Sequence, residues 1–495
     1  MRSKLLVLTV LFSLLWTPAA AQVATSPTSA TAAPDPAVSI SATAAPDATD
    51  STSAAAAPAG SFVASDPGVR GGDPGAGGSI PSLTNGQSYL FGVGKEDFGE
   101  AEGVADGLGP RFNLDSCFGC HAQPAAGGTS PAVNPQVAVA TDFGANNDVP
   151  FFVTKNGPVR EARFKYKSDG SRDGGVHALF VISGRVDDTG DASACRIKQE
   201  NFKAQDKNDN LIFRIPTPVF GAGLIESIPD SAIYANQSAA PGKKAALGIG
   251  GKPNRIRLDQ GTPNSNGNDG TIARFGWKAQ NKSLLLFSGE AYNVEMGISN
   301  ELFQTERDET PECQYAPAPN DTTAIDETSF AVTLSAIEKF SFFMRFLAPP
   351  APSPDTPGGT ASIQNGRMLF EKVGCALCHT PTLRTGNTPV AALSNQDVNL
   401  FSDLLLHNMG ARLADDIIQG QAGPDEFRTA PLWGLGQRIF FLHDGRTTDL
   451  IQAIRAHRSP ATANFVASEA NAVVQNFNQL SEPEKQDLLN FLRSL

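Results

Sequence analysis

The chain has 495 residues, a formal net charge of −12 and six cysteines. This length exceeds the usual 100–200 residues of one domain, so more than one folded domain is expected. The negative charge argues against nucleic acid or an anionic membrane as partner, because both repel an acidic protein. The negative charge would suit a basic protein partner. The alternative interpretation is that the charge only keeps an exported protein in solution.

Residues 1–21 have the form of a secretory signal peptide. Arg2 and Lys4 precede an apolar run at residues 5–16, and three alanines at 19–21 fit the small-residue cleavage rule. The apolar run is too short to span a bilayer, and no later run reaches the necessary length. We therefore predict an exported protein without an integral membrane segment.

Residues 22–80 consist mostly of Ala, Pro, Thr, Ser and Gly. Such a composition cannot bury enough apolar surface to offset its ordering entropy, so this segment is predicted to be a disordered tether. Two domains are expected beyond it, at residues 81–350 and 351–495, joined near the proline-rich residues 348–357.

Two pentapeptides of the form C-x-x-C-H are the strongest chemical signal in the chain. This pattern attaches c-type haem: two thiols bond to the vinyl groups and the adjacent histidine binds iron. A zinc ribbon or a thioredoxin-like pair also uses C-x-x-C, but neither explains a histidine after both copies. Two covalent haems are predicted, and because c-type haem is attached after export, a periplasmic location follows. The attachment residues are Cys117, Cys120, His121, Cys375, Cys378 and His379.

A large insertion carrying some strands is expected after the first motif. The runs at residues 178–184 and 283–289 are β-like and are separated by loops rich in Asn, Asp and Gly. His177 precedes the first run, as either a catalytic residue above the first haem or an ordinary strand histidine. The cysteines outside the motifs, Cys195 and Cys313, are predicted to form a disulfide in an oxidising compartment.

The C-terminal part has the pattern of a small helical cytochrome domain. Ser362 is predicted to cap a helix that runs into the second motif, and Ser481 to Glu484 has the form of a capping box. Gly366 and Phe370 resemble the glycine and aromatic pair at which the first and last helices of c-type cytochromes cross. The expected fold is mainly α, with two cytochrome c-like haem domains and the β-containing insertion in the N-terminal one.

His457 is the best candidate for the sixth ligand of the second iron. It shares one helix face with Leu450 and Ile454, although a histidine satisfied by the core would show the same pattern. A closed haem transfers electrons, whereas an open one binds peroxide or dioxygen. Arg446 is a natural partner for a haem propionate. His407, Met409 and His443 are assigned mainly packing or haem-contact roles.

Five segments together resemble the family of dihaem oxidoreductases described as peroxidases or thiol oxidoreductases. The resemblance covers about residues 85–495, and the wider superfamily includes bacterial dihaem cytochrome c peroxidases and rubber oxygenases. It implies that Trp277 relays electrons between the haems, and that the sixth-ligand position falls on His457, where bacterial peroxidases usually have Met. The segments are residues 107–121, 274–280, 402–410, 428–436 and 441–446.

The expected function is peroxide reduction at the N-terminal haem, with electrons delivered through the C-terminal haem by a small redox protein as donor. His177, Gln280 and Glu290 are the candidate acid–base groups. A dioxygen-activating oxygenase and a pure electron-transfer cytochrome are the alternatives. The sequence does not decide whether calcium is bound.

Overall fold

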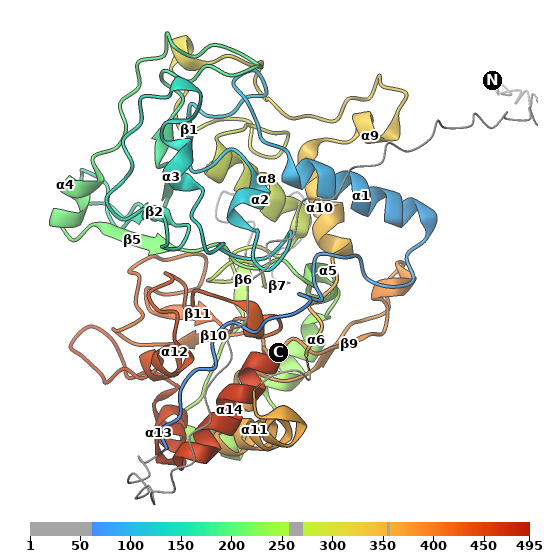
Figure 1. Ribbon diagram of the computed structural model, residues 1–495, viewed down its shortest axis with the longest axis vertical. Helices are drawn as coiled ribbons and strands as arrows, with labels where there is room; N and C mark the ends of the chain where they lie inside the picture. Colours follow the sequence, from blue (N-terminus) through green and yellow to red (C-terminus); the bar gives the residue numbers. More distant parts are fainter. Residues whose placement is uncertain (1–61, 257–270, 354–356) are drawn as a thin grey trace, which may run out of the picture. The chain divides into compact units, whose positions relative to one another are not determined.

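The computed structural model describes residues 62–256, 271–353 and 357–495 (Figure 1). The expected signal peptide and residues 22–61 of the expected tether lie outside these ranges. Within them, no helix combines the length and apolar character needed to cross a membrane.

The described residues form α-helices joined by long loops and by small antiparallel sheets. The longer helices are α1 (Asn85–Gly99), α8 (Leu284–Met296), α10 (Ala336–Phe346), α11 (Gly359–Val373), α13 (Asn471–Gln479) and α14 (Glu482–Ser494). The shorter helices are α2 (Cys117–Cys120), α3 (Gln136–Val139), α4 (Phe202–Lys207), α5 (Ala222–Glu226), α6 (Asp230–Gln237), α7 (Pro241–Leu247), α9 (Phe330–Thr333) and α12 (Leu450–Ala456).

One sheet has three strands, in the order β3-β2-β5, and the other strands form pairs. Its strands are β2 (Glu161–Phe164), β3 (Val176–His177) and β5 (Leu211–Arg214). The pairs are β1 (Arg111–Phe112) with β4 (Phe180–Val181), β6 (Asn254–Ile256) with β7 (Thr271–Ala273), β8 (Leu383–Arg384) with β9 (Asp397–Val398), and β10 (Leu406–Asn408) with β11 (Glu426–Arg428).

The fold is therefore mixed, and the expectation of a mainly α protein is corrected. Strands also occur after residue 351, where only helices were expected. The strands after residue 351 are two or three residues long. Such short strands carry too few residues to show the alternation by which a strand is recognised in a sequence.

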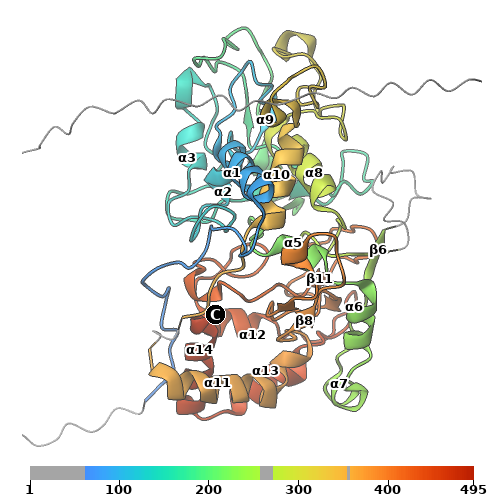
Figure 2. The same ribbon diagram turned by 90° about the vertical axis from the view of Figure 1, so that its right-hand side faces the viewer.

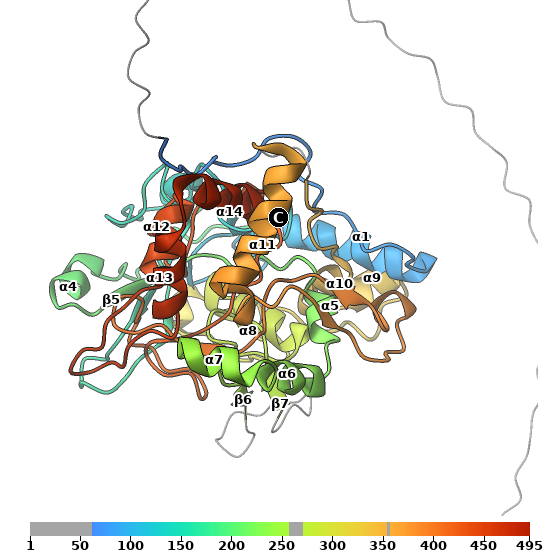
Figure 3. The same cartoon turned by 90° about the horizontal axis from the view of Figure 1, so that it is seen from below.

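Two pairs of helices are packed with their backbones in close contact. Helix α1 lies beside α10, and α11 lies beside α14 (Figures 1 and 2). A Cβ added at Gly94 of α1 would lie 2.2 Å from the backbone oxygen of Lys339, and one added at Gly366 of α11 would lie 2.0 Å from that of Asp487. Glycine is required at both positions because any side chain would push the helices apart. Figure 3 shows α11 and α14 crossing.

The helix boundaries follow the predicted caps only in part. The capping box from Ser481 to Glu484 is confirmed, and a second one joins Ser335 to Glu338 at the start of α10. The predicted cap at Ser362 is wrong, because α11 begins at Gly359 and Ser362 lies inside it. Its hydroxyl donates a hydrogen bond to Asp487 of α14 instead.

The run at residues 283–289 is helical and not a strand. Ser283 is the N-cap of α8, and its hydroxyl accepts a hydrogen bond from the backbone of Leu286. A short apolar run has no clear period, so buried strands and buried helices cannot be told apart from it. The first β-like run does contain a strand, β4.

The predicted disulfide between Cys195 and Cys313 is confirmed, with an S–S distance of 2.11 Å. Both residues are buried. The bridge closes a segment of 118 residues that carries most of the insertion.

The end of the expected tether is packed and not disordered. From residue 62 onward the chain runs along other parts of the fold, which corrects the boundary at residue 80. The Asp66 carboxylate accepts hydrogen bonds from Nε and Nη2 of Arg493, both at 2.8 Å, and from the backbone N–H of Leu450. The backbone N–H of Ile80 donates to Phe346 at the end of α10.

Candidate functional site

The first C-x-x-C-H motif forms one short helical turn. Cys117 and Cys120 begin and end α2, and His121 follows as its C-cap. The Nδ1 atom of His121 donates to the carbonyl of Gly128 at 2.9 Å. Because a carbonyl only accepts, the proton is on Nδ1, and Nε2 keeps its lone pair for a metal. The ring lies beside Phe98 of α1, with centroids 6.0 Å apart.

The second motif repeats this arrangement. The Nδ1 atom of His379 donates to the carbonyl of Phe401 at 3.1 Å, again leaving Nε2 free. Its ring lies beside Phe370 of α11, with centroids 6.4 Å apart. Phe370 follows Gly366 by four residues, as Phe98 follows Gly94, so each motif lies beside a crossing helix pair in the same way.

Each motif borders its own cavity. Cavity 1 is lined by Cys117, Cys120 and His121, and cavity 2 by Cys375, Cys378 and His379. Burial raises the pKa of Cys117 and Cys375 to about 12, so these thiols are neutral at neutral pH.

His457 faces cavity 2 together with His379. Its Nδ1 atom donates to the carbonyl of Ala453 at 2.7 Å, which leaves Nε2 free. Burial first, and the His457 imidazole second, lower the pKa of His379 to about 4. Burial also lowers the pKa of His457. Both rings are therefore neutral near pH 7, the form in which an imidazole binds iron.

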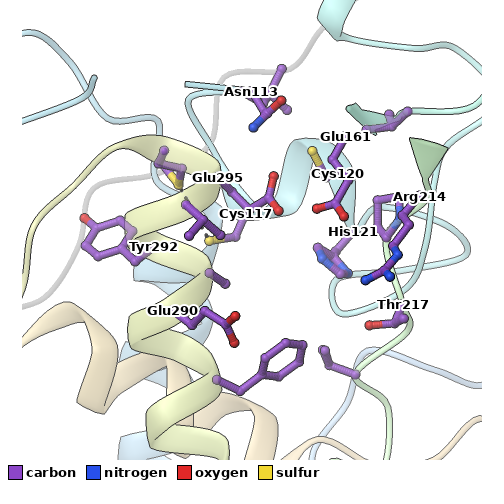
Figure 4. A pocket seen from close by; sticks show the side chains of 18 of the residues that line it. Asn113, Cys117, Cys120, His121, Glu161, Arg214, Thr217, Glu290, Tyr292 and Glu295 are labelled. Carbon is purple, nitrogen blue, oxygen red and sulfur yellow. Dashed lines mark hydrogen bonds between the residues drawn. The ribbon is translucent and has the colours of Figure 1, made fainter. Parts of the chain in front are cut away.

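Ionisable side chains that are buried or partly buried enter cavity 1 from two sides (Figure 4). Glu290 and Glu295 come from α8, whereas Glu161 and Arg214 come from β2 and β5. Arg163 also lines this cavity, and its Nε pairs with Glu161 at 2.5 Å. The cavity therefore combines apolar walls with groups that can hold protons.

Glu161 and Glu295 form a carboxyl pair joined by a hydrogen bond. Burial, the charge of Glu161 and this bond raise the pKa of Glu295 well above its usual range. Burial is the largest single influence on Glu161 and raises its pKa, but Arg163, the hydrogen bond to Glu295 and Arg214 together lower the pKa of Glu161. Two carboxyl groups so close cannot both ionise, so Glu295 holds the shared proton.

Some buried polar atoms at cavity 1 have no hydrogen-bond partner in the described residues. They are both amide atoms of Asn113 and the Oε1 atom of Gln280. Buried polar groups are almost always paired, so these atoms indicate that something polar belongs in the cavity. Haem propionates, or a ligand bound at the iron, would satisfy them.

Cavity 2 presents two buried guanidinium groups, Arg428 and Arg438. Burial lowers the pKa of each to about 10. Arg428 donates to the carbonyls of Gly276 and Thr429, while the guanidinium of Arg438 has no hydrogen bond to any part of the chain that the structure describes. Two buried cations without a paired carboxylate favour an anion in the cavity, as haem propionates would be.

Arg446 is not placed to bind a propionate of this cavity, which corrects the expectation. It is half-exposed, pairs with Asp444 at 2.6 Å, and donates to the carbonyl of Arg412. It does not line cavity 2. Its neighbour His443 does, stacked on Phe427 with centroids 4.4 Å apart.

His177 is likewise outside cavity 1. Its Nε2 atom pairs with Asp173 at 2.8 Å, and its ring stacks on Phe164 with centroids 3.6 Å apart. The register explains this, because His177 pairs with Ala162 across the sheet, while Glu161 and Arg163 alternate to the other face. Gln280 and Glu290, the other acid–base candidates, do line the cavity.

His407 has no free ring nitrogen. Nε2 contacts Asp403 at 2.9 Å and Nδ1 contacts Glu469 at 2.7 Å. Burial would lower the pKa of His407, but Asp403 and its other partners raise it, so the ring is a cation held between carboxylates. Within the described ranges, one group of side chains has metal-ligand spacing: Cys378, Asp403 and His407. Its cysteine, Cys378, belongs to the second C-x-x-C-H motif. His407 therefore has a packing role beside that motif.

Trp277 lines both cavities. Its Nε1 atom donates to the carbonyl of Ile215 at 2.8 Å, and the backbone N–H of Ile215 donates to the carbonyl of His443 at 2.8 Å. The indole ring lies 6.4 Å from that of His443, between centroids. The tryptophan therefore connects the two cavities through both contact and hydrogen bonds.

Of these residues, Glu161, Glu295, Arg428 and Arg438 were not identified as site residues from the sequence. Arg428 lies in one of the segments that resemble dihaem oxidoreductases, which was a usable signal. The two glutamates lie outside these segments, and only strand pairing and helix packing bring them together.

Both cavities fit haem, because they offer free imidazole nitrogens, partly buried thiols and unpaired polar groups. These features define a haem-binding oxidoreductase. Residues 159–495 match the family described as "Di-haem oxidoreductase, putative peroxidase". The match spans more than half of the chain, so this protein belongs to that family.

Solved structures give weaker similarities. Hydrazine synthase of Kuenenia stuttgartiensis is 19% identical with a TM-score of 0.21, over 34% of this chain and 56% of that chain. A MauG-like protein associated with microbial copper homeostasis is 23% identical with a TM-score of 0.23, over 34% of this chain and 53% of that chain. The chain spans little more than half the length of either protein. No curated protein matches.

Proposed function

We propose that this protein is a periplasmic c-type dihaem oxidoreductase that reduces a hydroperoxide in cavity 1, with electrons that enter through cavity 2. Cys117 and Cys120 would attach one haem and Cys375 and Cys378 the other, in two cytochrome c-like domains at residues 81–350 and 351–495. The repeated arrangement of crossing helices, aromatic residue and C-x-x-C-H motif supports two such domains. The family supports two haems.

The unequal supply of imidazoles to the two cavities carries this assignment. In cavity 2, His379 and His457 both present a free Nε2 atom. His121 is the histidine that lines cavity 1 among the described residues, together with the thioethers of Met296 and Met344. A haem in cavity 1 would therefore have one imidazole ligand and could take an exogenous ligand, whereas a haem in cavity 2 would have two imidazoles and would serve electron transfer.

The chain supplies the protons for the reaction through the carboxyl pair in cavity 1. Reduction of a hydroperoxide to an alcohol, or of hydrogen peroxide to water, breaks the O–O bond and consumes two electrons and two protons. Bound haem supplies the redox chemistry. Glu295 gives the first proton to the leaving oxygen, is reprotonated from solvent, and then passes the second proton in the same way, while Glu161 stays ionised beside Arg163.

Trp277 carries electrons from one cavity to the other, because it borders both. The donor would be a small redox protein, and the acidic chain suits a basic one. The charged interior of cavity 1 favours proton-consuming chemistry over cleavage of an apolar organic substrate, which would require an apolar pocket.

Peroxide consumption by the purified holoprotein with an artificial reductant tests the proposal. Glu295→Gln is expected to lower the rate about 100-fold, the usual contribution of a general acid, and to change its pH profile. Glu306→Gln is the matched control, since Glu306 is a partly buried carboxyl outside cavity 1 whose pKa burial raises to about 8. Cyanide should bind one haem of the two. If cyanide binds neither iron and no peroxide is consumed, the protein is an electron-transfer cytochrome.

A further inference from the structure

Three charged side chains form a fully buried cluster between the two cavities. Asp415 accepts from Nη2 of Arg214 at 2.6 Å and from Nζ of Lys278 at 3.0 Å. The side chains of Asp415 and Lys278 are 0% exposed and that of Arg214 is 2% exposed. We call these three residues the Asp415 cluster.

The Asp415 cluster borders cavity 1 and is separated from cavity 2 by one side chain. Arg214 lines cavity 1 directly. The ammonium of Lys278 lies 4.1 Å from the ring centroid of Phe427, which lines cavity 2 and stacks on His443. Lys278 also follows Trp277 in the chain, so the cluster flanks the residue that borders both cavities.

The charges of the cluster are fixed in place and do not cancel. Lys278 also donates to the carbonyls of Gly423 and Glu426, at 2.8 and 3.0 Å, and Arg214 donates to Gln419 at 2.6 Å. Burial lowers the pKa of Lys278 to about 8, with Asp415 opposing it, so the ammonium remains charged near pH 7. Within the three residues of the cluster, two cations and one anion give a net charge of +1.

Other charged groups face the cluster at its ends. Glu161 and Arg163 act on the Arg214 side, where they pair with each other. Asp425 acts on Lys278 as a weaker influence than Asp415. Burial lowers the pKa of His443 to about 4, so this ring adds no charge near pH 7.

We propose that the Asp415 cluster sets the reduction potentials of both haems through its buried positive charge. A cation in a medium of low dielectric constant stabilises the state with one more electron, and water does not screen it there. The effect falls with distance, so Lys278 acts mainly on the haem of cavity 2 and Arg214 mainly on that of cavity 1. The inference requires haem in both cavities and does not depend on peroxide chemistry.

Redox titration of the holoprotein, with each haem followed by its own spectrum, tests the sign of the effect. Lys278→Met removes a positive charge, so both potentials should fall, with the larger shift at the haem of cavity 2. Asp415→Asn removes the negative charge and should raise both potentials. If the substitutions acted only by disturbing the packing, there would be no reason for the two variants to shift the reduction potentials in opposite directions. If Asp415→Asn does not accumulate as holoprotein, Asp425→Asn tests the upward direction.

The chain contains a second cluster of the same composition that serves as the control. Asp230 pairs with Arg274 and with Lys282, and none of the three lines either cavity. Lys282→Met and Asp230→Asn should leave both potentials close to those of the unsubstituted protein. Haem content is measured first, so loss of haem is separated from a shift in potential. Shifts of equal sign in both Asp415-cluster variants, or shifts no larger than those of the control variants, overturn the proposal.

Discussion

At the scale of single residues, a backbone carbonyl fixes the protonated nitrogen of each histidine expected to bind iron. His121, His379 and His457 each donate from Nδ1 to a main-chain oxygen, at 2.9, 3.1 and 2.7 Å. This bond determines the tautomer and the ring orientation before any metal arrives. His407 shows the contrast, because carboxylates occupy both its nitrogens and exclude it as a ligand.

Replacement of His457 tests its role in cavity 2. His457→Ala is expected to convert one haem to a high-spin or water-bound state, because it removes the imidazole that faces His379. The other haem and the covalent attachment of both should be unchanged. Electron paramagnetic resonance of the oxidised protein measures this.

His177→Ala is the control for that experiment, since His177 pairs with Asp173 outside both cavities. Its spectra should match those of the unsubstituted protein. Unaltered spectra in His457→Ala as well would assign His457 to the core.

At the scale of helices, each haem motif lies beside a tight crossing that depends on one glycine. Gly94 in α1 contacts the backbone of α10, and Gly366 in α11 contacts the backbone of α14. Phe98 and Phe370 then pack beside the motif histidines. The crossing therefore determines both the helix spacing and the position of the histidine ring.

Helix α1 offers a matched pair of glycines for testing this packing. Gly94→Ala is expected to lower the free energy of unfolding by about 1–3 kcal/mol, because the new Cβ would lie 2.2 Å from the oxygen of Lys339. Gly92→Ala, with nothing within 4 Å of the added Cβ, should raise the free energy of unfolding by about 0.5–1 kcal/mol. Chemical denaturation followed by circular dichroism measures both. Equal effects of the two substitutions would contradict the close contact.

At the scale of the whole described chain, long-range contacts hold together segments that are far apart in sequence. Asp66 pairs with Arg493 and caps α12, while the backbone at Ile80 bonds to the end of α10. Trp277 contributes to both cavities. The residue that borders both cavities therefore belongs to neither C-x-x-C-H motif.

Replacement of Trp277 tests the proposed electron path between the cavities. Trp277→Phe is expected to slow electron transfer between the haems while both haems keep their spectra, because a phenyl ring is harder to oxidise and lacks the hydrogen bond to Ile215. Stopped-flow reduction of the oxidised protein measures the rate. Trp433→Phe is the control, since Trp433 is also buried but lines neither cavity. Equal rates in both variants would remove Trp277 from the electron path.

Features that depend on neighbouring residues in the sequence were predictable. Three such features each span only a few residues. They are the C-x-x-C-H motifs, the capping box from Ser481 to Glu484, and the glycine and aromatic pair at Gly366 and Phe370. The disulfide followed from the count of cysteines, because two remained after the motifs were assigned.

The tertiary structure decided which side chains line each cavity. Strand register places Glu161 and Arg163 in cavity 1 and turns His177 away from it, and one residue of shift would exchange the two faces. The packing of α8 then brings Glu295 to Glu161. Likewise, Arg438 lines cavity 2 and Arg446 does not. The sequence alone did not show which of these two arginines would lie beside the second haem motif.

The sequence by itself thus predicted the proposed haem attachment, because the two thiols and the adjacent imidazole lie within one turn of chain. Only the tertiary structure decided which charges surround each cavity and which tryptophan joins them. A charge acts on its site through distance and burial, and both depend on contacts such as that of Asp415 with Arg214, 201 residues away in sequence.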